Sequence, residues 1–296
     1  MRLAIRDDDT NYFTSPEALE HCYSGIWDVV PPSLCLISKV KGKWDYWVHQ
    51  IYKDKHQTDW GAWTKDDTVY PIEENVDLIS FLKARLGDKK IDICFHAKHH
   101  RNNDAILPQD VKENYIRGAE FYTTRDLSLY IRDEVDHLNA LLDCNITVFT
   151  PPQNMLSPQG YRSVLKAGLN PCNAGLPFYR KEKDITGLIN IGKQLYFRLR
   201  HQGYNYPYVL NYSNHTEIPY HYSLQPNTTL ESLVENFERV RRFDGDFVLS
   251  THYVEFLYTM EHNNKVTMKN VLEEFLSYIQ RYRVNYVTLS EMLKTN

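Results

Sequence analysis

The sequence of 296 residues contains few cysteines, and none of them is spaced for metal or disulfide chemistry. There are five, and no two form a Cys-x-x-Cys pair: Cys22, Cys35, Cys94, Cys144 and Cys172. An odd number without such pairs argues against a disulfide framework and against a structural zinc cluster. Because Cys35, Cys94 and Cys144 lie in or beside apolar runs, we expect small buried side chains in a reducing compartment.

A long apolar run is also missing. No window approaches the roughly 18 apolar residues of a membrane-spanning helix. The first residues, 1–5, run directly into Arg6-Asp7-Asp8-Asp9 without the apolar segment of a signal peptide. We therefore expect a cytoplasmic protein without a membrane span.

The sequence has no excess of basic residues. Its formal net charge is −4, which provides no positive surface for nucleic acid. Hydrophobic residues make up 42% and charged residues 24%, as in ordinary globular proteins. Since no internal repeat or low-complexity linker divides the chain, we predict one domain over residues 1–296 and leave the oligomeric state open.

Short apolar runs alternate with segments of helical spacing. We predict strands at residues 3–5, 33–38, 91–95, 146–149, 196–199, 208–212, 246–249 and 285–289, and helices between most of them. This alternation predicts βα units and therefore an α/β fold with a parallel sheet. About seven units in this length favour a closed or nearly closed (β/α) barrel, and an open doubly wound sheet is the alternative.

Four polar clusters directly follow four of the predicted strands. They are Arg6-Asp7-Asp8-Asp9, residues 96–100 with their three histidines, residues 150–154, and Ser250-Thr251-His252. In a barrel of parallel strands the carboxyl ends lie on one rim, where active sites form. We therefore expect these clusters to lie close together in space.

Two of the clusters contain candidate metal ligands. Three consecutive aspartates repel one another if buried, so Arg6 or a metal must neutralise them; a solvated turn is the other interpretation. His96 and His100 are spaced one helical turn apart, which suits a shared metal, although His99 could replace either of them and an exposed histidine-rich loop is the alternative. One Asp and two His form a three-ligand set with open positions, typical of a catalytic metal site.

Together these clusters are similar to the motifs of the polysaccharide deacetylase family, also known as NodB-homology or carbohydrate esterase family 4 proteins. That family has an Asp-Asp pair, a His-x-x-x-His motif, an aromatic-Arg-Pro-Pro-type loop and a late Leu-x-His-like motif. Their order and spacing agree here from Leu3 to Leu293. Three details resemble a divergent branch associated with surface polysaccharide synthesis: Arg-x-Asp-Asp at residues 6–9, Glu120-Phe121, and Phe149-x-Pro-Pro-x-Asn.

The resemblance implies a distorted (β/α) barrel of about seven parallel strands that hydrolyses N-acetyl groups on a sugar or polysaccharide precursor, in O-antigen or capsule synthesis. It implies a divalent metal, zinc first, bound by Asp9, His96 and His100. It makes Asp8 the general base and His252 the general acid. It also implies substrate-binding residues, which are Glu120, Pro151, Pro152 and Asn154.

The chain departs from the family pattern at two positions and lacks one motif. Ala97 stands where the family has Ser or Thr, and Thr150 stands where it has an Arg that orients the base. We find no motif that supplies a carboxylate near the acid histidine. These departures leave a metal- or glycan-binding protein without hydrolysis as one alternative. A metal-dependent glycosidase is another, with Asp8 and either Glu120 or Glu255 as its pair of carboxylates.

Residues 39–72 are polar and rich in aromatic side chains, and we predict an insertion over one face of the barrel. The insertion contains four of the five tryptophans, Trp44, Trp47, Trp60 and Trp63. They either stack on sugar rings or form a local apolar core that holds the insertion together.

Overall fold

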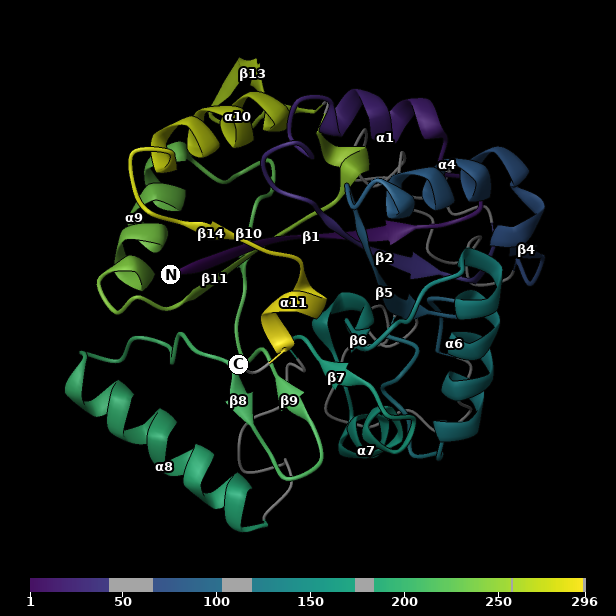
Figure 1. Cartoon of the computed structure of the whole chain (residues 1–296), viewed down its shortest axis with the longest axis horizontal. Coiled ribbons are helices and arrows are strands. Elements are labelled where there is room, and N and C mark those ends of the chain that lie inside the picture. The colour runs from purple at the N-terminus through teal and green to yellow at the C-terminus, as the bar shows by residue number, and fades with distance from the viewer. Residues whose placement is uncertain (43–65, 103–118, 174–183, 257, 295–296) are drawn as a thin grey trace.

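The computed structural model describes residues 1–42, 66–102, 119–173, 184–256 and 258–294 (Figure 1). Within them, eight strands form one main sheet in which every pairing is parallel. Its strands are β1 (Arg2–Thr10), β2 (Ser33–Ile37), β5 (Asp92–Ala97), β6 (Val148–Phe149), β7 (Asn170–Pro171), β10 (Tyr222–Ser223), β11 (Asp246–Thr251) and β14 (Asn285–Tyr286).

The order of these strands distinguishes a barrel from an open doubly wound sheet. The path is β10-β11-β1-β2-β5-β6-β7, and β14 pairs with β1 beside it. This is the strand order of a barrel that is open between β7 and β10. The late strand β11 pairs with β1 on the side opposite to β2, as in a barrel. In a doubly wound sheet, the order in which strands are added would instead reverse at a switch point inside the sheet. The expected distorted (β/α) barrel is confirmed, in an incompletely closed form.

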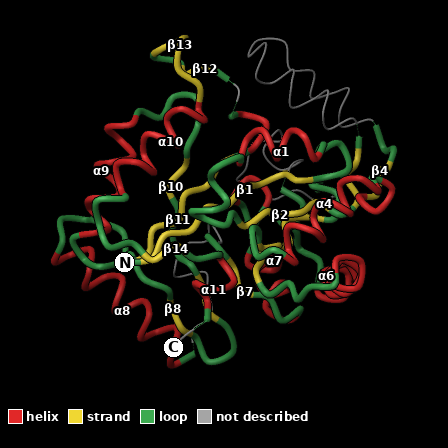
Figure 2. The backbone as a smooth tube through the Cα atoms, turned by 45° about the horizontal axis from the view of Figure 1, so that its top comes forward, coloured by secondary structure: helices red, strands yellow, loops and turns green. Residues whose placement is uncertain are grey.

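Helices surround the strands, as Figures 1 and 2 show. They are α1 (Pro16–Tyr23), α4 (Val76–Gly87), α6 (Ser128–Leu142), α7 (Pro158–Lys166), α8 (Ile185–Arg200), α9 (Leu230–Arg241), α10 (Met268–Ile279) and α11 (Leu289–Leu293). Several start where side-chain caps predict: Ser15 accepts from the Ala18 amide, and Ser157 from that of Gly160. Among the described helices, none has the length and apolar character that a membrane crossing requires.

Side chains of the main sheet alternate between two apolar clusters. Leu3 and Ile5 belong to the larger cluster, which the outer helices cover, whereas Ala4 belongs to a smaller one. The smaller cluster contains Cys35, Cys94 and Cys172, and α11 contributes Met292 and Leu293 to it. All five cysteines are free, and small side chains of this kind suit the narrow interior of a barrel. The expectation of small buried cysteines is therefore confirmed for Cys35 and Cys94, while Cys144 is partly exposed.

The segment before β10 corrects one prediction. Residues 196–199, predicted as a strand, belong to the long helix α8. Tyr196 and Phe197 favour strands locally, but residues 185–200 form one helix, which Asp184 caps by accepting from the Gly187 amide. The predicted strand at 208–212 is confirmed only for Leu210–Asn211 (β8), which pairs with β9 (Thr216–Glu217).

Two further hairpins lie outside the main sheet. At the edges of the predicted insertion, β3 (Lys39–Lys41) pairs with β4 (Val69–Pro71), and the 3-10 turn η1 (Ile72–Glu74) follows. The four tryptophans of this insertion lie outside the described residues. The second hairpin joins β12 (Thr259–Met260) to β13 (Asn263–Thr267).

Candidate metal centre

Three side chains predicted as metal ligands lie together at the carboxyl ends of β1 and β5. Oδ1 of Asp9 is 3.2 Å from Nε2 of His96 and 3.2 Å from Nε2 of His100. One ligand atom from each of the three residues lies within 4.8 Å of the others. A metal with tetrahedral bonds of about 2.0–2.1 Å holds neighbouring ligand atoms about 3.3 Å apart. The spacing therefore fits a small divalent ion.

The fit also holds for the individual atoms. Oδ1 of Asp9 is buried and accepts no hydrogen bond from the described residues. The two histidines lower the pKa of the Asp9 carboxyl well below its usual value, although burial acts in the opposite direction. A buried carboxylate oxygen that faces two imidazole nitrogens is a donor set that suits a divalent metal.

Backbone conformation turns two of these ligands toward each other. Asp9 has φ of 75° and His100 has φ of 52°, both in the left-handed region that residues other than glycine rarely adopt. At Asp9 this interrupts the alternation of β1, and Nδ2 of Asn11 donates to the Asp9 carbonyl at 2.6 Å. Backbone conformations of this kind are found mainly at functional sites, where the surrounding structure holds them in place.

Neighbouring groups fix the orientation of His96. Its Nδ1 lies 2.8 Å from the carbonyl oxygen of Thr150 and 2.9 Å from the Thr150 hydroxyl. A proton on Nδ1 donates to the carbonyl, which leaves the lone pair of Nε2 directed at Asp9. Such a second hydrogen bond is how proteins select the tautomer of a metal-binding histidine.

The question whether His99 or His100 joins the cluster is answered by the hydrogen bonds of this turn. Nδ1 of His99 lies 2.6 Å from the carbonyl oxygen of Lys39, away from Asp9. Oε2 of Glu120 accepts from the backbone amides of His99 and His100 at 2.8 and 2.7 Å, and Oε1 accepts from the Tyr130 hydroxyl at 2.5 Å. Glu120, predicted to contact substrate, is thus buried and holds the backbone at His100.

The three consecutive aspartates have three different environments. Asp7 accepts a hydrogen bond from the Tyr23 hydroxyl, and burial raises the pKa of the Asp7 carboxyl well above its usual value. Asp8 pairs with Arg6 through two hydrogen bonds, Nε to Oδ1 at 2.7 Å and Nη2 to Oδ2 at 2.5 Å. Burial raises the pKa of Asp8, but Arg6 lowers it more, to about 2. Asp7 bonds to Tyr23, Asp8 is paired with Arg6, and Asp9 faces the histidines, so each carboxyl of the triplet has its own partner.

His252, predicted as the general acid, lies on the same rim after β11. Its Nε2 is 3.7 Å from Oδ2 of Asp9, and its Nδ1 is 3.3 Å from Oε2 of Glu255 on the 3-10 turn η4 (Tyr253–Glu255). Burial lowers the pKa of His252, but Glu255, followed by Asp9, raises it more, to about 10. Glu255 is thus a carboxylate beside His252 that the sequence motifs did not reveal; its signal in the sequence is the i, i+3 spacing.

The other predicted substrate residues form a turn after β6. Pro151 and Pro152 are buried, and Asn154 ends the 3-10 turn η2 (Pro152–Asn154) with φ of 54°. They follow Thr150, whose carbonyl and hydroxyl oxygens contact His96. Their contact with substrate stays a prediction.

A further histidine, His221, lies beside the cluster; from the sequence, His215 and His221 are only the next candidates for the acid after His252. Nδ1 of His221 accepts from Nδ2 of Asn173 at 2.8 Å and lies 3.4 Å from Nη1 of Arg6. Burial, followed by the charge of Arg6, lowers the pKa of His221 to about 3, so its ring is neutral and its proton is on Nε2. The signal in the sequence was weak, because His221 lies in a segment without clear periodicity.

Comparisons with known proteins give structural likeness without a sequence family. No family model and no curated protein matches the sequence. Similar solved structures include the family 4 acetyl xylan esterase from Clostridium thermocellum, in complex with a cobalt ion; it is 11% identical, with a TM-score of 0.47, over 99% of this chain and 90% of that one. A carbohydrate esterase family 4 pseudoenzyme from Bacillus anthracis is 10% identical, with a TM-score of 0.44, over 99% of this chain and 65% of that one.

A third similar structure is the 4-alpha-glucanotransferase from Thermococcus litoralis, which is 14% identical, with a TM-score of 0.48, over 99% of this chain and 40% of that one. Two of these three neighbours belong to the family that the sequence motifs resemble.

Proposed function

We propose that the chain is a metal-dependent deacetylase that hydrolyses N-acetyl groups on a sugar or polysaccharide precursor. The observation that carries the proposal is the 3.2 Å spacing from Oδ1 of Asp9 to Nε2 of both His96 and His100. Zinc is the first candidate, since it takes carboxylate oxygen and imidazole nitrogen in such three-ligand sites. We further propose a cytoplasmic role in surface polysaccharide synthesis, in O-antigen or capsule, with an acetylated sugar as the substrate.

The chemistry needs a base, which we assign to Asp8. A bound divalent ion polarises the amide carbonyl and makes water more acidic. Asp8 is ionised at every working pH, because its pKa is about 2, and the guanidinium of Arg6 fixes both of its oxygens. We assign to Asp8 the tasks of orienting the attacking water and accepting its proton. Arg6 here performs the task that the resemblance assigns to an arginine at the position of Thr150.

The leaving amine needs a proton, which we assign to His252. An amine leaves poorly unless it is protonated, so an acid must be charged when the carbon–nitrogen bond breaks. Glu255, 3.3 Å from Nδ1 of His252, keeps this imidazole protonated, and its other nitrogen, Nε2, faces Asp9. Nε2 can thus donate its proton to an amine bound beside the cluster.

The carboxylates of the glycosidase alternative are engaged elsewhere. Glu120 accepts from two backbone amides and the Tyr130 hydroxyl, and Glu255 pairs with His252. A pair of glycosidase carboxylates needs both groups directed at the glycosidic bond, and these two are occupied by other partners. The deacetylase proposal uses all of these contacts, so we prefer it.

The test is release of acetate from an N-acetylated sugar by purified protein that has been stripped with a chelator and reloaded with Zn²⁺. We expect turnover to be lost on stripping and restored on reloading. Asp9→Ala should stay inactive after reloading, while the matched variant His99→Ala should keep turnover. Metal uptake without acetate release would leave a metal-binding protein without hydrolysis and refute the proposed activity.

A further inference from the structure

Helix α8 (Ile185–Arg200) exposes its apolar face and buries its other side. The buried residues are Gly187, Asn190 and Phe197. On the outside, Leu199 is 85% exposed and Ile185 78%. Ten large apolar side chains are exposed in the described part of the chain, and six of them belong to this helix: Ile185, Leu188, Ile189, Leu195, Tyr196 and Leu199. An amphipathic helix of a globular protein normally does the reverse.

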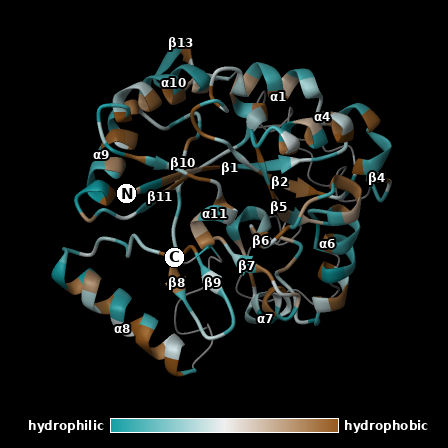
Figure 3. Cartoon of the chain, in the orientation of Figure 1, coloured by the Kyte–Doolittle hydropathy of each residue, from teal (hydrophilic) through white to brown (hydrophobic). Residues whose placement is uncertain are grey.

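These six residues form a stripe along one face of the helix. Ile185, Leu188 and Ile189 make one group and Leu195, Tyr196 and Leu199 a second, each at i, i+3, i+4 spacing, and Gly192 lies between the groups on the same face. From Ile185 to Leu199 the stripe is roughly 21 Å long at 1.5 Å per residue. Figure 3 shows the apolar residues of α8 at the edge of the molecule. Contiguous exposed apolar surface of this extent marks an interaction site.

The helix is anchored in this orientation at several points along its length. Asp184 caps its amino end by accepting from the Gly187 amide at 2.7 Å. Nδ2 of Asn190 donates to the carbonyl of Asn211 at 2.9 Å. Near the carboxyl end, the ring of Phe197 packs 4.9 Å from that of Phe243. The outward direction of the stripe is thus set by contacts on the opposite side of the helix.

The charge of α8 differs in sign from that of the chain. Residues 185–200 include Lys193, Arg198 and Arg200 and no acidic residue, which gives +3. The whole chain has −4, so the remainder has −7 (−4 minus +3). At 100° per residue, Lys193 and Arg200 lie beside Ile189 at one edge of the apolar stripe, and Arg198 lies toward the other. Cations bordering an apolar stripe match the acyl and headgroup layers of an anionic bilayer.

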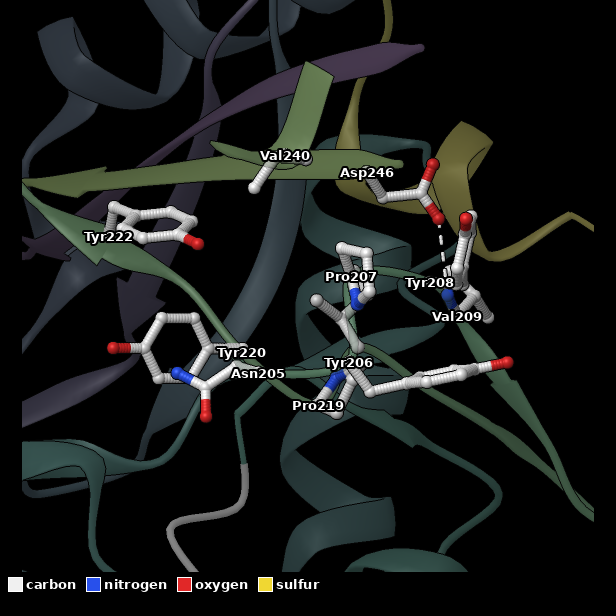
Figure 4. A pocket seen from close by; sticks show the side chains of 11 residues that line it. Asn205, Tyr206, Pro207, Tyr208, Val209, Pro219, Tyr220, Tyr222, Val240 and Asp246 are labelled. Carbon is white, nitrogen blue, oxygen red and sulfur yellow. Dashed lines mark hydrogen bonds between the residues drawn. The ribbon is translucent and has the colours of Figure 1, made fainter. Parts of the chain in front are cut away.

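Aromatic side chains extend this surface. A cavity of about 70 Å³ beside the helix is lined by Leu195, Arg198, Tyr206 and Tyr220, among others. Figure 4 shows Tyr206 and Tyr220 in the adjoining pocket, which shares both residues. Tyrosine, with an apolar ring and a polar tip, suits the boundary between lipid and water. Arg198 adds a cation that can pair with a phosphate there.

We propose that α8 binds the surface of an anionic phospholipid membrane, lying in the plane of the interface with its apolar stripe toward the acyl chains. A second copy of this chain matches the stripe less well than a membrane does, because α8 has no carboxylate to pair with the cations on the α8 of the other copy. The inference rests on α8 alone and does not depend on the proposed deacetylase function.

The test is sedimentation of the full-length protein with vesicles of phosphatidylcholine alone or mixed with phosphatidylglycerol. We expect binding to the mixed vesicles and weaker binding as salt rises. Leu199→Gln should lower the affinity about tenfold, and Lys193→Gln about fivefold. Leu129→Gln and Lys83→Gln are matched controls on other helices, where Leu129 is 67% exposed, and they should bind like the wild type.

Equal loss in the α8 and control variants, or no binding to mixed vesicles, would overturn the proposal. Light scattering after size exclusion tests the alternative, in which a second copy of the chain covers the stripe. A dimer that Leu199→Gln dissociates, without vesicle binding, would assign the stripe to that second copy. Metal content and acetate release from a soluble sugar should be unchanged in every α8 variant. A failure of the metal site would therefore leave the vesicle result intact, and the reverse also holds.

Discussion

Arg6 holds Asp8 by two parallel hydrogen bonds, although the two residues are only two positions apart on the same strand. Alternation along β1 directs both side chains to the interior of the barrel, where Arg6 has no exposed surface. A buried arginine paired in this way fixes the geometry of the carboxylate as well as its charge.

Substitution of Arg6 should therefore lower both stability and turnover while sparing the metal. In Arg6→Gln the buried charge of Asp8 loses its partner, and we expect a loss of roughly 3–5 kcal/mol of unfolding free energy. Turnover should fall about 10²-fold if Asp8 is the base. Chemical denaturation, metal content and kcat measured on the same preparation test this. Full activity in a folded Arg6→Gln protein would contradict the role of Asp8.

His252→Ala should lower kcat by roughly 10²–10⁴ for an N-acetyl substrate and leave metal content unchanged. The loss should be smaller for an activated acetyl ester, whose leaving group needs no proton. Equal losses on both substrates would indicate that His252 positions the reacting groups and is not the acid.

The pairing of Glu255 with His252 determines how activity and stability should depend on pH. Because the folded pKa of His252 is raised to about 10, the protonated acid persists well above pH 6.5, and activity should decline only as pH rises through the folded pKa. The stability that this ion pair adds is likewise complete below about pH 6.5 and is lost as pH rises toward 10. Glu255→Gln should move the alkaline limb of the pH–rate profile toward lower pH. An unchanged limb would mean that another group sets it.

Two glycines offer a matched test of the packing. A Cβ on Gly160 would lie 1.9 Å from the carbonyl oxygen of Phe121, whereas one on Gly192 would meet nothing within 4 Å. Gly160→Ala should destabilise the protein by roughly 1–3 kcal/mol, because the added methyl group would clash with the backbone at Phe121 and push α7 away from it. Gly192→Ala should stabilise it by about 0.4–1 kcal/mol. Thermal unfolding distinguishes the two, and equal effects would contradict this packing.

Sequence patterns reveal those parts of the site that depend on local spacing. Asp9, His96 and His100 stand out because each follows an apolar strand, and parallel strands bring such positions to one rim. The choice between His99 and His100 could not be made, since it depends on the backbone conformation at residue 100. The pairing of Arg6 with Asp8 could not be predicted: neutralisation of the triplet by Arg6, by a metal or by solvent all stayed open, because the choice requires knowing which face of β1 lines the barrel.

The longer helices and strands were predictable for a similar reason. Helix caps such as Ser15 and Ser157 act over three residues and are visible in the sequence. In α8, the strand propensity of residues 196–199 concealed the helix. Its apolar stripe faces outward and does not pack on the sheet. Amphipathic spacing predicts a helix, but it does not predict which side the helix buries.

The central claim, a metal held by Asp9, His96 and His100, is tested most directly by the metal stoichiometry of the purified protein and its variants. We predict one divalent ion per chain in the wild type and in His99→Ala, and loss of that ion in Asp9→Ala, His96→Ala and His100→Ala. Stoichiometric metal retained in all three ligand variants, or lost in His99→Ala alone, would contradict the assignment.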